Sequence, residues 1–550
     1  KERGREMQSA SSSTRGRAGS LVRSLTEPGD GGSEGGAGKW EGAALVDVPT
    51  EEGFSWRGLL SYIGPGFLMC IAYVDPGNFE SDLQAGAKYG YQLLWVLVWA
   101  TVAGLMVQSL AIRLALATGL DLAQACRKEY PPTIRRALWI VAELAIVASD
   151  IPEVIGTAFA LKLLFGWPTW IGILVTSADT MLFLAMNSLG VRLLEGFMLV
   201  LVGVMAICYL VEMFFVQGSV TEIMEGIIVP KVPDLNALYI AVSLLGAVVM
   251  PHALYLHSSL VLSRNVAPGE KAARTALTYN VVESAIALAV TLFINIAVVT
   301  TAAEAVRSPE TSPEEKRALL NEPLQNAPKL LKHVLGDNGR LAAGLFSVAL
   351  LASGQSSTMT GTYAGQFVMS GFVQMKLPPV VRSFLTRSVA IVPSLAVALI
   401  AGDHGSEQLI VLSSVVLCFQ LPFALVPLVK FCAEPKALGP MAIKAGFRTA
   451  SYVLSAIIVV ANIYLMIDFV AESGLVNASV GGVFTGMLAT ALGLVYLGCI
   501  AALVARPVHL SLVGEDAPAN QIARDLKRED DKEEESAEAP LINDEDGARA

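Results

Sequence analysis

The segments DPGN at residues 75–78 and MPH at residues 250–252 each interrupt an apolar run that is long enough to cross a membrane. Proline removes a backbone N–H and cannot continue a helix, and hydrocarbon offers no water to the carbonyl groups that the break leaves without partners. Such a break is tolerated only where it lines a polar site. Interrupted helices in corresponding halves of a chain are typical of a transporter's binding site near the middle of the bilayer.

The two breaks carry side chains that together suit a cation. Asp75 offers a hard anion, Asn78 an amide oxygen and Met250 a soft thioether. A carboxylate at the membrane centre costs roughly 2.5 to 3.5 kcal/mol on insertion scales, so Asp75 requires a partner. Structural alternatives stay open, because Asp75 can cap the second half-helix, Asn78 can cap or pack, and methionine taken alone is ordinary packing filler. The position beside Pro251 makes Met250 a candidate ligand.

The thioether also predicts which ions the site prefers. Sulfur binds manganese, iron, cobalt or cadmium but offers little to calcium and magnesium, which prefer shells of oxygen ligands. We therefore expect Met250 to act as a selectivity filter against the abundant alkaline-earth ions.

The composition is that of a polytopic membrane protein. Of 550 residues, 53% are hydrophobic and only 16% are charged, and the mean hydropathy is +0.56. We expect about twelve transmembrane helices, near residues 57–87 (broken), 92–117, 137–164, 168–188, 193–215, 236–262 (broken), 277–301, 340–371, 383–402, 407–432, 450–470 and 480–504. No P-loop, nucleophile elbow or kinase motif is present, so we expect neither an enzyme nor an ATP-driven pump, with no cofactor and no nucleic-acid partner.

The spans and tails divide the chain into five parts. Residues 1–55 and 515–550 are predicted to be disordered tails, the second strongly acidic, and the tails carry most of the formal charge of −10. Because the breaks fall in the first and sixth spans, residues 56–215 and 236–432 form two five-helix halves with opposite orientation, an inverted repeat. Residues 450–504 add helices 11 and 12.

Basic loop residues predict the orientation. Counted in order, one side of the membrane receives most of the basic residues, namely Arg127, Lys128, Arg135, Arg136, Arg192, Arg264, Lys271, Arg274, Lys376, Arg382, Lys436, Lys444 and Arg448. That side is cytoplasmic by the positive-inside rule, so both termini are predicted to be cytoplasmic. The plasma membrane or an endomembrane such as the vacuole is the expected location, while the Ser- and Arg-rich stretch from Met7 to Leu25 leaves a transit peptide open.

The third span supplies titratable groups for proton movement. Asp150 and Glu153 are three residues apart and share one helix face, and Glu143 lies seven residues before Asp150 on about the same face. They are expected to face the bundle interior as a polar track. The alternative is that they pair with Arg382 or Arg387 for structure alone.

Two histidines follow the second break. His252 and His257 are five residues apart and do not share a face of a regular helix. Either ring can relay protons near physiological pH, and we favour His252 because it lies beside the break.

Several segments in order carry a specific resemblance to a known family. They are DPGN at 75–78, SDIPEVIG at 149–156, MPH at 250–252 with LHS at 256–258, and ASGQS at 352–356. These resemble the signature segments of the natural resistance-associated macrophage protein (NRAMP) family of divalent metal transporters, in particular its plant and algal members. The resemblance covers roughly residues 55–505.

The resemblance implies an all-α, LeuT-like fold with a 5+5 inverted repeat and broken helices 1 and 6. It implies proton-coupled uptake of manganese and iron(II), often also cobalt, cadmium or zinc, by a protein expected to be a monomer in the lipid bilayer. By position, the family's metal ligands are Asp75, Asn78, the backbone carbonyl of Ala247 and the sulfur of Met250. Gln420 matches a residue implicated in the occluded state.

One departure bears on selectivity. The family usually has asparagine directly after Met-Pro-His, where this chain has Ala253. An altered preference, toward magnesium or aluminium, is therefore one alternative, and a non-transporting signalling module is another. A sodium-coupled amino-acid symporter of the same fold is disfavoured, because Asp75 would repel the substrate carboxylate.

Overall fold

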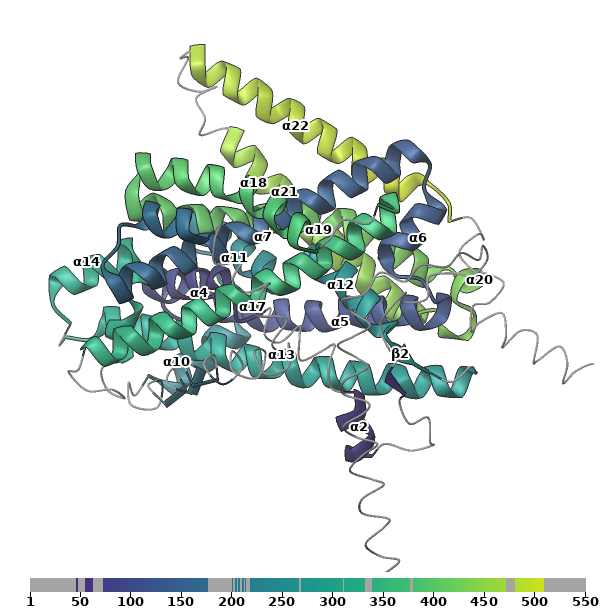
Figure 1. The fold of residues 1–550 in the computed structure, drawn as a ribbon, viewed down its shortest axis with the longest axis horizontal. Coiled ribbons are helices and arrows are strands. Elements are labelled where there is room, and N and C mark those ends of the chain that lie inside the picture. Colours follow the sequence, from purple (N-terminus) through teal and green to yellow (C-terminus); the bar gives the residue numbers. More distant parts are fainter. Residues whose placement is uncertain are drawn as a thin grey trace, which may run out of the picture.

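The computed structural model describes residues 46–47, 55–62, 73–176, 218–266, 269–309, 311–331, 339–375, 379–470 and 480–508, with isolated positions between 200 and 213. This part of the chain is almost entirely helical, and its long helices lie side by side in one bundle (Figure 1). Two very short strands, β1 (Val46–Asp47) and β2 (Arg264–Asn265), pair in parallel. They connect the N-terminal segment to the chain just after the second broken helix.

The helical elements follow the order that the apolar runs predict. They are α2 (Trp56–Tyr62), α4 (Pro76–Tyr89), α5 (Leu94–Thr118), α6 (Leu122–Glu129), α7 (Pro132–Phe165), α10 (Val220–Ile228), α11 (Leu235–Val248), α12 (Pro251–Val261), α13 (Glu270–Arg307), α14 (Pro313–Asn321), α15 (Pro323–Asn326), η2 (Ala327–Leu331), α17 (Gly339–Val373), α18 (Pro379–Ile400), α19 (Gly402–Ala433), α20 (Pro435–Leu438), η3 (Gly439–Met441), α21 (Ala445–Val470) and α22 (Val480–Ala505).

Five stretches of the described residues are helical, long and apolar enough to cross a membrane: Leu94–Thr118, Leu235–Val261, Glu270–Arg307, Gly402–Ala433 and Ala445–Ile467. Shorter apolar helical segments, Phe384–Ile400 and Thr490–Ala505, coincide with further predicted spans. Helices α7 and α17, with 34 and 35 residues, also coincide with predicted spans but contain more polar residues. The predicted spans at 168–188 and 193–215 lie largely outside the described residues.

The structure shows the second predicted break in full and, at the first, the helix that starts after it, while residues 63–72 lie outside the described part of the chain. Helix α4 begins directly after Asp75, and two residues, Val249 and Met250, separate the end of α11 from Pro251, which opens α12. Figure 1 shows α4 and α11 in the half of the bundle that ends at α10 and α14, called here the outer end. Helix α12 lies in the other half, toward α6 and α20, called here the inner end. The broken segments therefore meet near the middle of the bundle.

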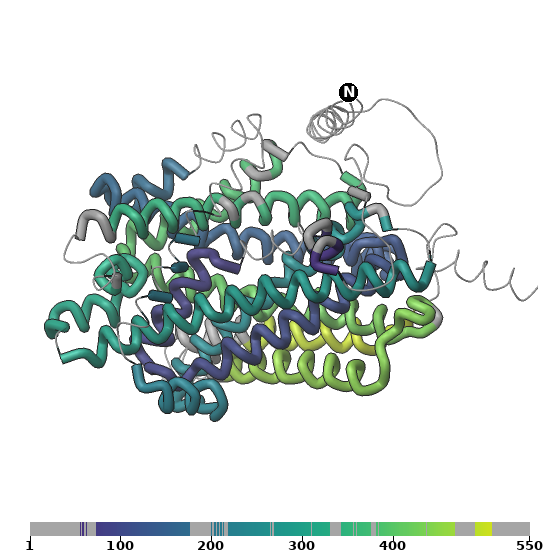
Figure 2. Tube along the Cα trace, turned by 90° about the horizontal axis from the view of Figure 1, so that it is seen from below, coloured from purple at the N-terminus to yellow at the C-terminus, as the bar shows by residue number. Residues whose placement is uncertain are grey.

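Close backbone contacts hold the broken helices against their neighbours. A Cβ at Gly86 of α4 would lie 2.3 Å from the carbonyl oxygen of Val299 in α13. A Cβ at Gly246 of α11 would lie 2.0 Å from the carbonyl oxygen of Ser414 in α19. Any larger residue would have to separate these helices. Helices α21 and α22 lie along one side of the bundle next to α19 (Figure 2).

The chain between the seventh and eighth predicted spans is a long loop by sequence, and the structure shows that it contains short helices. Helices α14 and α15 and the following 3-10 turn η2 lie at the outer end. Leu319, Leu324 and Leu330 from this segment are buried in the same apolar cluster as Leu83 of α4 and Phe346 of α17. This segment therefore packs over the outer half of the first broken helix.

Candidate metal site

Asp75 is the N-cap of α4, which explains why the helix begins there. Its backbone is extended, and Oδ1 accepts a hydrogen bond from the backbone N of Asn78 at 2.8 Å. Pro76 occupies the first helical position, where a missing N–H costs no helical hydrogen bond. The capping alternative is thus a real structural role, and it uses Oδ1. The other carboxylate oxygen, Oδ2, lies beside Gly77, where an added Cβ would come within 3.2 Å of it.

Asn78 connects the two breaks. Its side-chain Nδ2 donates to Oδ1 of Asp75 at 2.7 Å and to the carbonyl oxygen of Ala247, near the end of α11, at 3.1 Å. All three residues are at most 4% exposed. Oδ1 of Asn78 is buried and has no hydrogen-bond donor among the described residues. Three of the predicted ligands therefore form one connected group of a carboxylate, an amide and a backbone carbonyl.

Met250 lies at the second break, between α11 and α12. It is the N-cap position of α12, makes no side-chain capping bond and is 2% exposed. Its side chain belongs to a small buried cluster that includes Tyr73, two residues before Asp75, and Ala253. Met250 thus shares a buried cluster with the chain just before the first break. Ala253, the departure from the usual asparagine, is 3% exposed and contributes only a methyl group to this cluster.

The surroundings of the first break satisfy the backbone that proline releases. Ser353 of α17 donates its hydroxyl to the carbonyl oxygen of Val74, just before the break. Pro76 packs against α7 so closely that a Cβ at Gly156 would lie 2.5 Å from the proline Cβ. Gly156 of the SDIPEVIG segment and Ser353 of the ASGQS segment therefore both contact the chain at the first break.

The predicted proton residues of α7 are buried and paired with α18. Glu153 is 1% exposed, lies 3.3 Å from Nη1 of Arg387 and accepts from the hydroxyl of Thr358 in α17 at 2.7 Å. Arg387 donates to the same hydroxyl at 2.5 Å. Nearer the inner end, Arg382 donates to Glu143 at 2.5 Å. The arginine pairing expected as an alternative is therefore present.

Asp150 lies between these two pairs. It is 4% exposed and is within electrostatic range of both Arg387 and Arg382. A Cβ at Gly361 of α17 would come within 3.5 Å of its Oδ1, so this carboxylate faces the α17 backbone. The prediction that Asp150 and Glu153 face the bundle interior is confirmed. The track runs along α7 from beside the first break toward the inner end.

The two histidines are both buried in α12. His252 is 4% exposed and His257 is 1% exposed. Nδ1 of His252 and both ring nitrogens of His257 have no hydrogen-bond partner among the described residues. Their place in the fold does not distinguish one from the other as a proton relay.

Gln420 lies on α19, and it makes no hydrogen bond to the other predicted ligands within the described part of the chain. Its Oε1 is buried without a hydrogen-bond donor in the described part of the chain. Helix α19 passes α11 at the close approach of Gly246, so Gln420 lies on a helix adjacent to the second break rather than within it.

Sequence reasoning overlooked a set of buried carboxylates at the outer end. Glu80 and Asp82 of α4 and Glu407 of α19 are fully buried. Gln84 donates to Glu80 at 2.5 Å, and Lys88 donates to Gln84 at 2.7 Å, which forms a ladder at i,i+4 spacing along α4. The signal was available, because charged residues at membrane depth are rare and usually functional.

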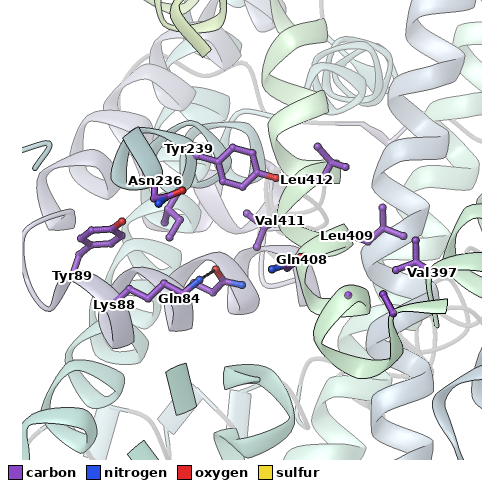
Figure 3. A pocket seen from close by; sticks show the side chains of 13 residues that line it. Gln84, Lys88, Tyr89, Asn236, Tyr239, Val397, Gln408, Leu409, Val411 and Leu412 are labelled. Atoms are coloured by element: carbon purple, nitrogen blue, oxygen red, sulfur yellow. Dashed lines mark hydrogen bonds between the residues drawn. The ribbon is translucent and has the colours of Figure 1, made fainter. Parts of the chain in front are cut away.

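This ladder leads to a cavity of about 650 Å³ at the outer end. Figure 3 shows Gln84, Lys88 and Tyr89 on one wall, Asn236 and Tyr239 of α11 on another, and the first turns of α19 opposite. The cavity therefore borders the outer halves of both broken helices.

Comparisons with known proteins agree with this geometry. A family model described as natural resistance-associated macrophage protein-like matches residues 66–468. The chain is 45% identical over 499 residues to the metal transporter Nramp3 of Oryza sativa subsp. japonica, covering 89% of this chain and 90% of the relative. It is 44% identical over 461 residues to the metal transporter Nramp6 of Arabidopsis thaliana, covering 84% and 86%.

Solved structures give the same result for the fold. The manganese transporter of Eremococcus coleocola matches with a TM-score of 0.69 at 28% identity, over 88% of this chain and 98% of that one. Mhp1, a nucleobase-cation-symport-1 family transporter, matches with a TM-score of 0.51 at 15% identity, over 84% and 96%. The second likeness concerns the fold alone, and both confirm the LeuT-like arrangement expected from the two breaks.

Proposed function

The chain belongs to the natural resistance-associated macrophage protein family of metal transporters, and from that premise we propose that it carries divalent transition metals into the cytosol together with protons. Manganese(II) and iron(II) are the main substrates in this proposal, and cobalt, cadmium and zinc are further ones. The observation that carries the proposal is the connection between the two breaks, in which Asn78 bridges Asp75 and the carbonyl of Ala247.

The metal would bind where these oxygens converge. In the structure the N–H groups of Asn78 occupy the space between Oδ1 of Asp75 and the Ala247 carbonyl. A cation entering that space must displace the amide donors, and rotation of the amide would turn the free Oδ1 of Asn78 toward the ion. The N-terminus of α4 carries a partial positive charge, so the carboxylate of Asp75 serves both the helix and the metal.

Selectivity in this proposal comes from Met250. A thioether completes a mixed oxygen and sulfur shell that manganese and iron(II) accept, while calcium and magnesium lose an oxygen ligand there. The burial of Met250 with Tyr73 and Ala253 gives the ion little room to keep waters on that side. Ions that hold water tightly, magnesium above all, are therefore rejected.

Proton movement would follow the acidic track of α7. Asp150 and Glu153 lie behind the first break. Arg387 pairs with Glu153 and Arg382 with Glu143, and Asp150 lies within electrostatic range of both arginines. When the metal's charge arrives at Asp75, a proton held there is released, because two cations compete for one carboxylate. The track provides acceptors for that proton, and His252 is a further relay.

Alternating access would connect the site to each side in turn. The cavity beside Lys88 and Tyr239 borders α4 and α11 at the outer end, and in this proposal it would serve as the access route from that side. Tilting of the half-helices α4 and α12 would close it and open the inner end.

Ala253 supports one alternative, a shifted ion preference within the same mechanism. A methyl group there removes a polar side chain next to Met250, which changes hydration at the second break. Retention of Met250 itself favours transition metals over magnesium or aluminium.

The proposal is tested by uptake into proteoliposomes that contain the purified protein and indicators for metal and for pH. Saturable manganese uptake that acidifies the lumen and persists in excess magnesium and calcium supports it. Uptake of magnesium with equal efficiency would favour the shifted preference, and manganese uptake without acidification would remove the proton-coupled part.

A further inference from the structure

A second cavity, of about 510 Å³, lies at the inner end, away from the metal site. It is bounded by the last turn of α19, the first turns of α21 and the end of α22. Lys430, Arg448 and Arg506 line it together with one carboxylate, Glu434. Three cationic groups against one anionic group give the cavity a net charge of +2. This is the side of the membrane that the basic loops predict to be cytoplasmic.

Lys430 builds the floor of this cavity. Its ammonium donates to the carbonyl oxygens of Leu503, Val504 and Arg506, at 2.6 Å to Leu503 and 3.0 Å to Val504. These are carbonyls of the last turn of α22, which lack helical partners. All three donors of the ammonium are therefore used, so Lys430 fixes the end of α22 and contributes charge rather than hydrogen bonds.

The two arginines have their guanidinium groups available. Arg448 and Arg506 are exposed, and neither side chain has a hydrogen bond or ion pair with any described residue. Guanidinium groups bind phosphate oxygens in pairs, which makes arginine well suited to phosphate recognition. The cavity therefore presents two guanidinium groups to a ligand, next to the positive charge of Lys430.

An exposed apolar strip leads from the cavity toward the middle of the bilayer. Tyr452 lines the cavity, and Val453, Ile457 and Val460 continue along the outward face of α21. Tyr452, Val453, Ile457 and Val460 are between 45% and 63% exposed. Helix α21 lies at the edge of the bundle (Figure 2), so side chains on its exposed face would lie against the lipid chains of a surrounding bilayer. A ligand with both a phosphate and a hydrocarbon tail fits these two features at once.

We propose that the cavity between α19, α21 and α22 binds the phosphate head group of an anionic membrane lipid, with its acyl chains along α21. Basic pockets between helix ends on the cytoplasmic side bind such head groups in other membrane proteins. A lipid fits better than a free phosphate compound, because the apolar strip would contribute nothing to a soluble ligand. Bound there, the lipid would tie α21 and α22 to the end of α19.

The test measures lipid retention by native mass spectrometry of the full-length protein taken from bilayers of phosphatidylcholine with a small fraction of phosphatidylinositol 4-phosphate. The variant is Arg448→Gln with Arg506→Gln, which leaves Lys430 and the end of α22 intact. The matched control is Lys128→Gln with Arg136→Gln, two exposed basic residues at the same end. Equal thermal unfolding midpoints show that the variants are folded.

We expect one tightly held phosphoinositide in the wild type and in the control, and at least about tenfold weaker retention in the arginine variant, which corresponds to about 1.4 kcal/mol. Equal retention in the arginine variant would overturn the proposal. So would full competition by soluble inositol phosphate, which would identify a site for a free phosphate compound.

A further measurement tests whether another segment of this chain occupies the cavity in place of a lipid. The C-terminal tail carries the acidic run Glu533, Glu534 and Glu535, which matches the cavity in charge. If the wild type retains no more lipid than the arginine variant, and retention rises severalfold only when these three residues are replaced by glutamine, the acidic run is the natural occupant and the proposal fails. Unchanged retention supports the lipid.

Discussion

Asn78 donates two hydrogen bonds to one oxygen of Asp75, from its backbone N at 2.8 Å and from its side-chain Nδ2 at 2.7 Å. The first bond caps α4, and the second aligns an amide that also reaches the carbonyl of Ala247 across the other break. Capping and ligand placement therefore depend on the same pair of residues. The two hydrogen bonds from Asn78 stabilise the buried carboxylate of Asp75 at membrane depth, at the position where it also caps α4.

The role of Met250 is tested by Met250→Ala. The change removes the thioether and leaves space at the break, so waters or an oxygen-preferring ion gain access. Manganese uptake should persist with a weaker apparent affinity, while calcium and magnesium, excluded by the wild type, should enter. Radiolabelled calcium flux into proteoliposomes measures this directly. Continued exclusion of calcium by the variant would contradict the filter role.

The close contact of Pro76 with α7 is tested by Gly156→Ala. The new methyl carbon would lie 2.5 Å from the proline Cβ, so α4 or α7 must move. We expect a loss of roughly 1 to 3 kcal/mol in stability, as for other overpacked sites, and slower manganese uptake. Gly344→Ala on α17, where nothing lies within 4 Å of the added Cβ, is the control. Similar behaviour of both variants would show that the break tolerates displacement.

Glu153→Gln tests the acidic track. The hydroxyl of Thr358 can still donate to the new side chain, but the residue can no longer carry a proton or balance Arg387. Manganese uptake should continue while fewer protons enter per metal ion, as read from simultaneous metal and pH indicators. The control is Glu225→Gln, an exposed outer-end carboxylate paired with Lys231 at 2.7 Å. An unchanged ratio in Glu153→Gln would exclude Glu153 from proton movement.

Asp121, in the loop that precedes α6, should make stability depend on pH. Burial raises the pKa of this N-cap carboxyl to about 6, although hydrogen bonds from the backbone of Gln124 and Ala123 lower it. The folded state thus binds the proton more tightly, and this contribution to the free energy of unfolding is complete below about pH 4 and lost as pH rises through 6.

Asp121→Asn keeps the cap and cannot titrate. Relative to the wild type, its free energy of unfolding should rise by up to about 3 kcal/mol between pH 4 and pH 7, because the variant lacks the upward pKa shift of about two units that Asp121 has in the folded state. Thermal unfolding in detergent at the two pH values checks this, and Asp121→Ser, a second neutral cap, should behave alike. Parallel changes in wild type and variants would contradict the assignment.

The sequence predicts the centre of the fold well because the decisive signals there are local. Proline within an apolar run defines a break wherever the chain packs, and Asp75, Asn78 and Met250 lie beside the two prolines. The i,i+3 spacing of Asp150 and Glu153 likewise predicts a shared face without knowledge of neighbours, and both residues are buried as expected.

Contacts between distant segments could not be predicted in the same way. The hydroxyl of Ser353 reaches the carbonyl of Val74 only because α17 packs against the break, and no periodicity shows this. The buried Glu407 accepts a hydrogen bond at 3.1 Å from the backbone N of Gln325 in α15, a segment that the sequence alone predicts to be a loop. The choice between Arg382 and Arg387 as partners also depended on packing, and each pairs with a different glutamate.

The central claim is that Asp75 binds the transported metal and does more than cap α4. The most direct measurement compares wild type with Asp75→Asn in proteoliposomes, following manganese entry and lumenal pH together, because asparagine caps a helix about as well as aspartate. The account predicts saturable uptake with acidification in the wild type, and loss of both in a variant whose unfolding midpoint is unchanged. Wild-type manganese uptake by folded Asp75→Asn would contradict it.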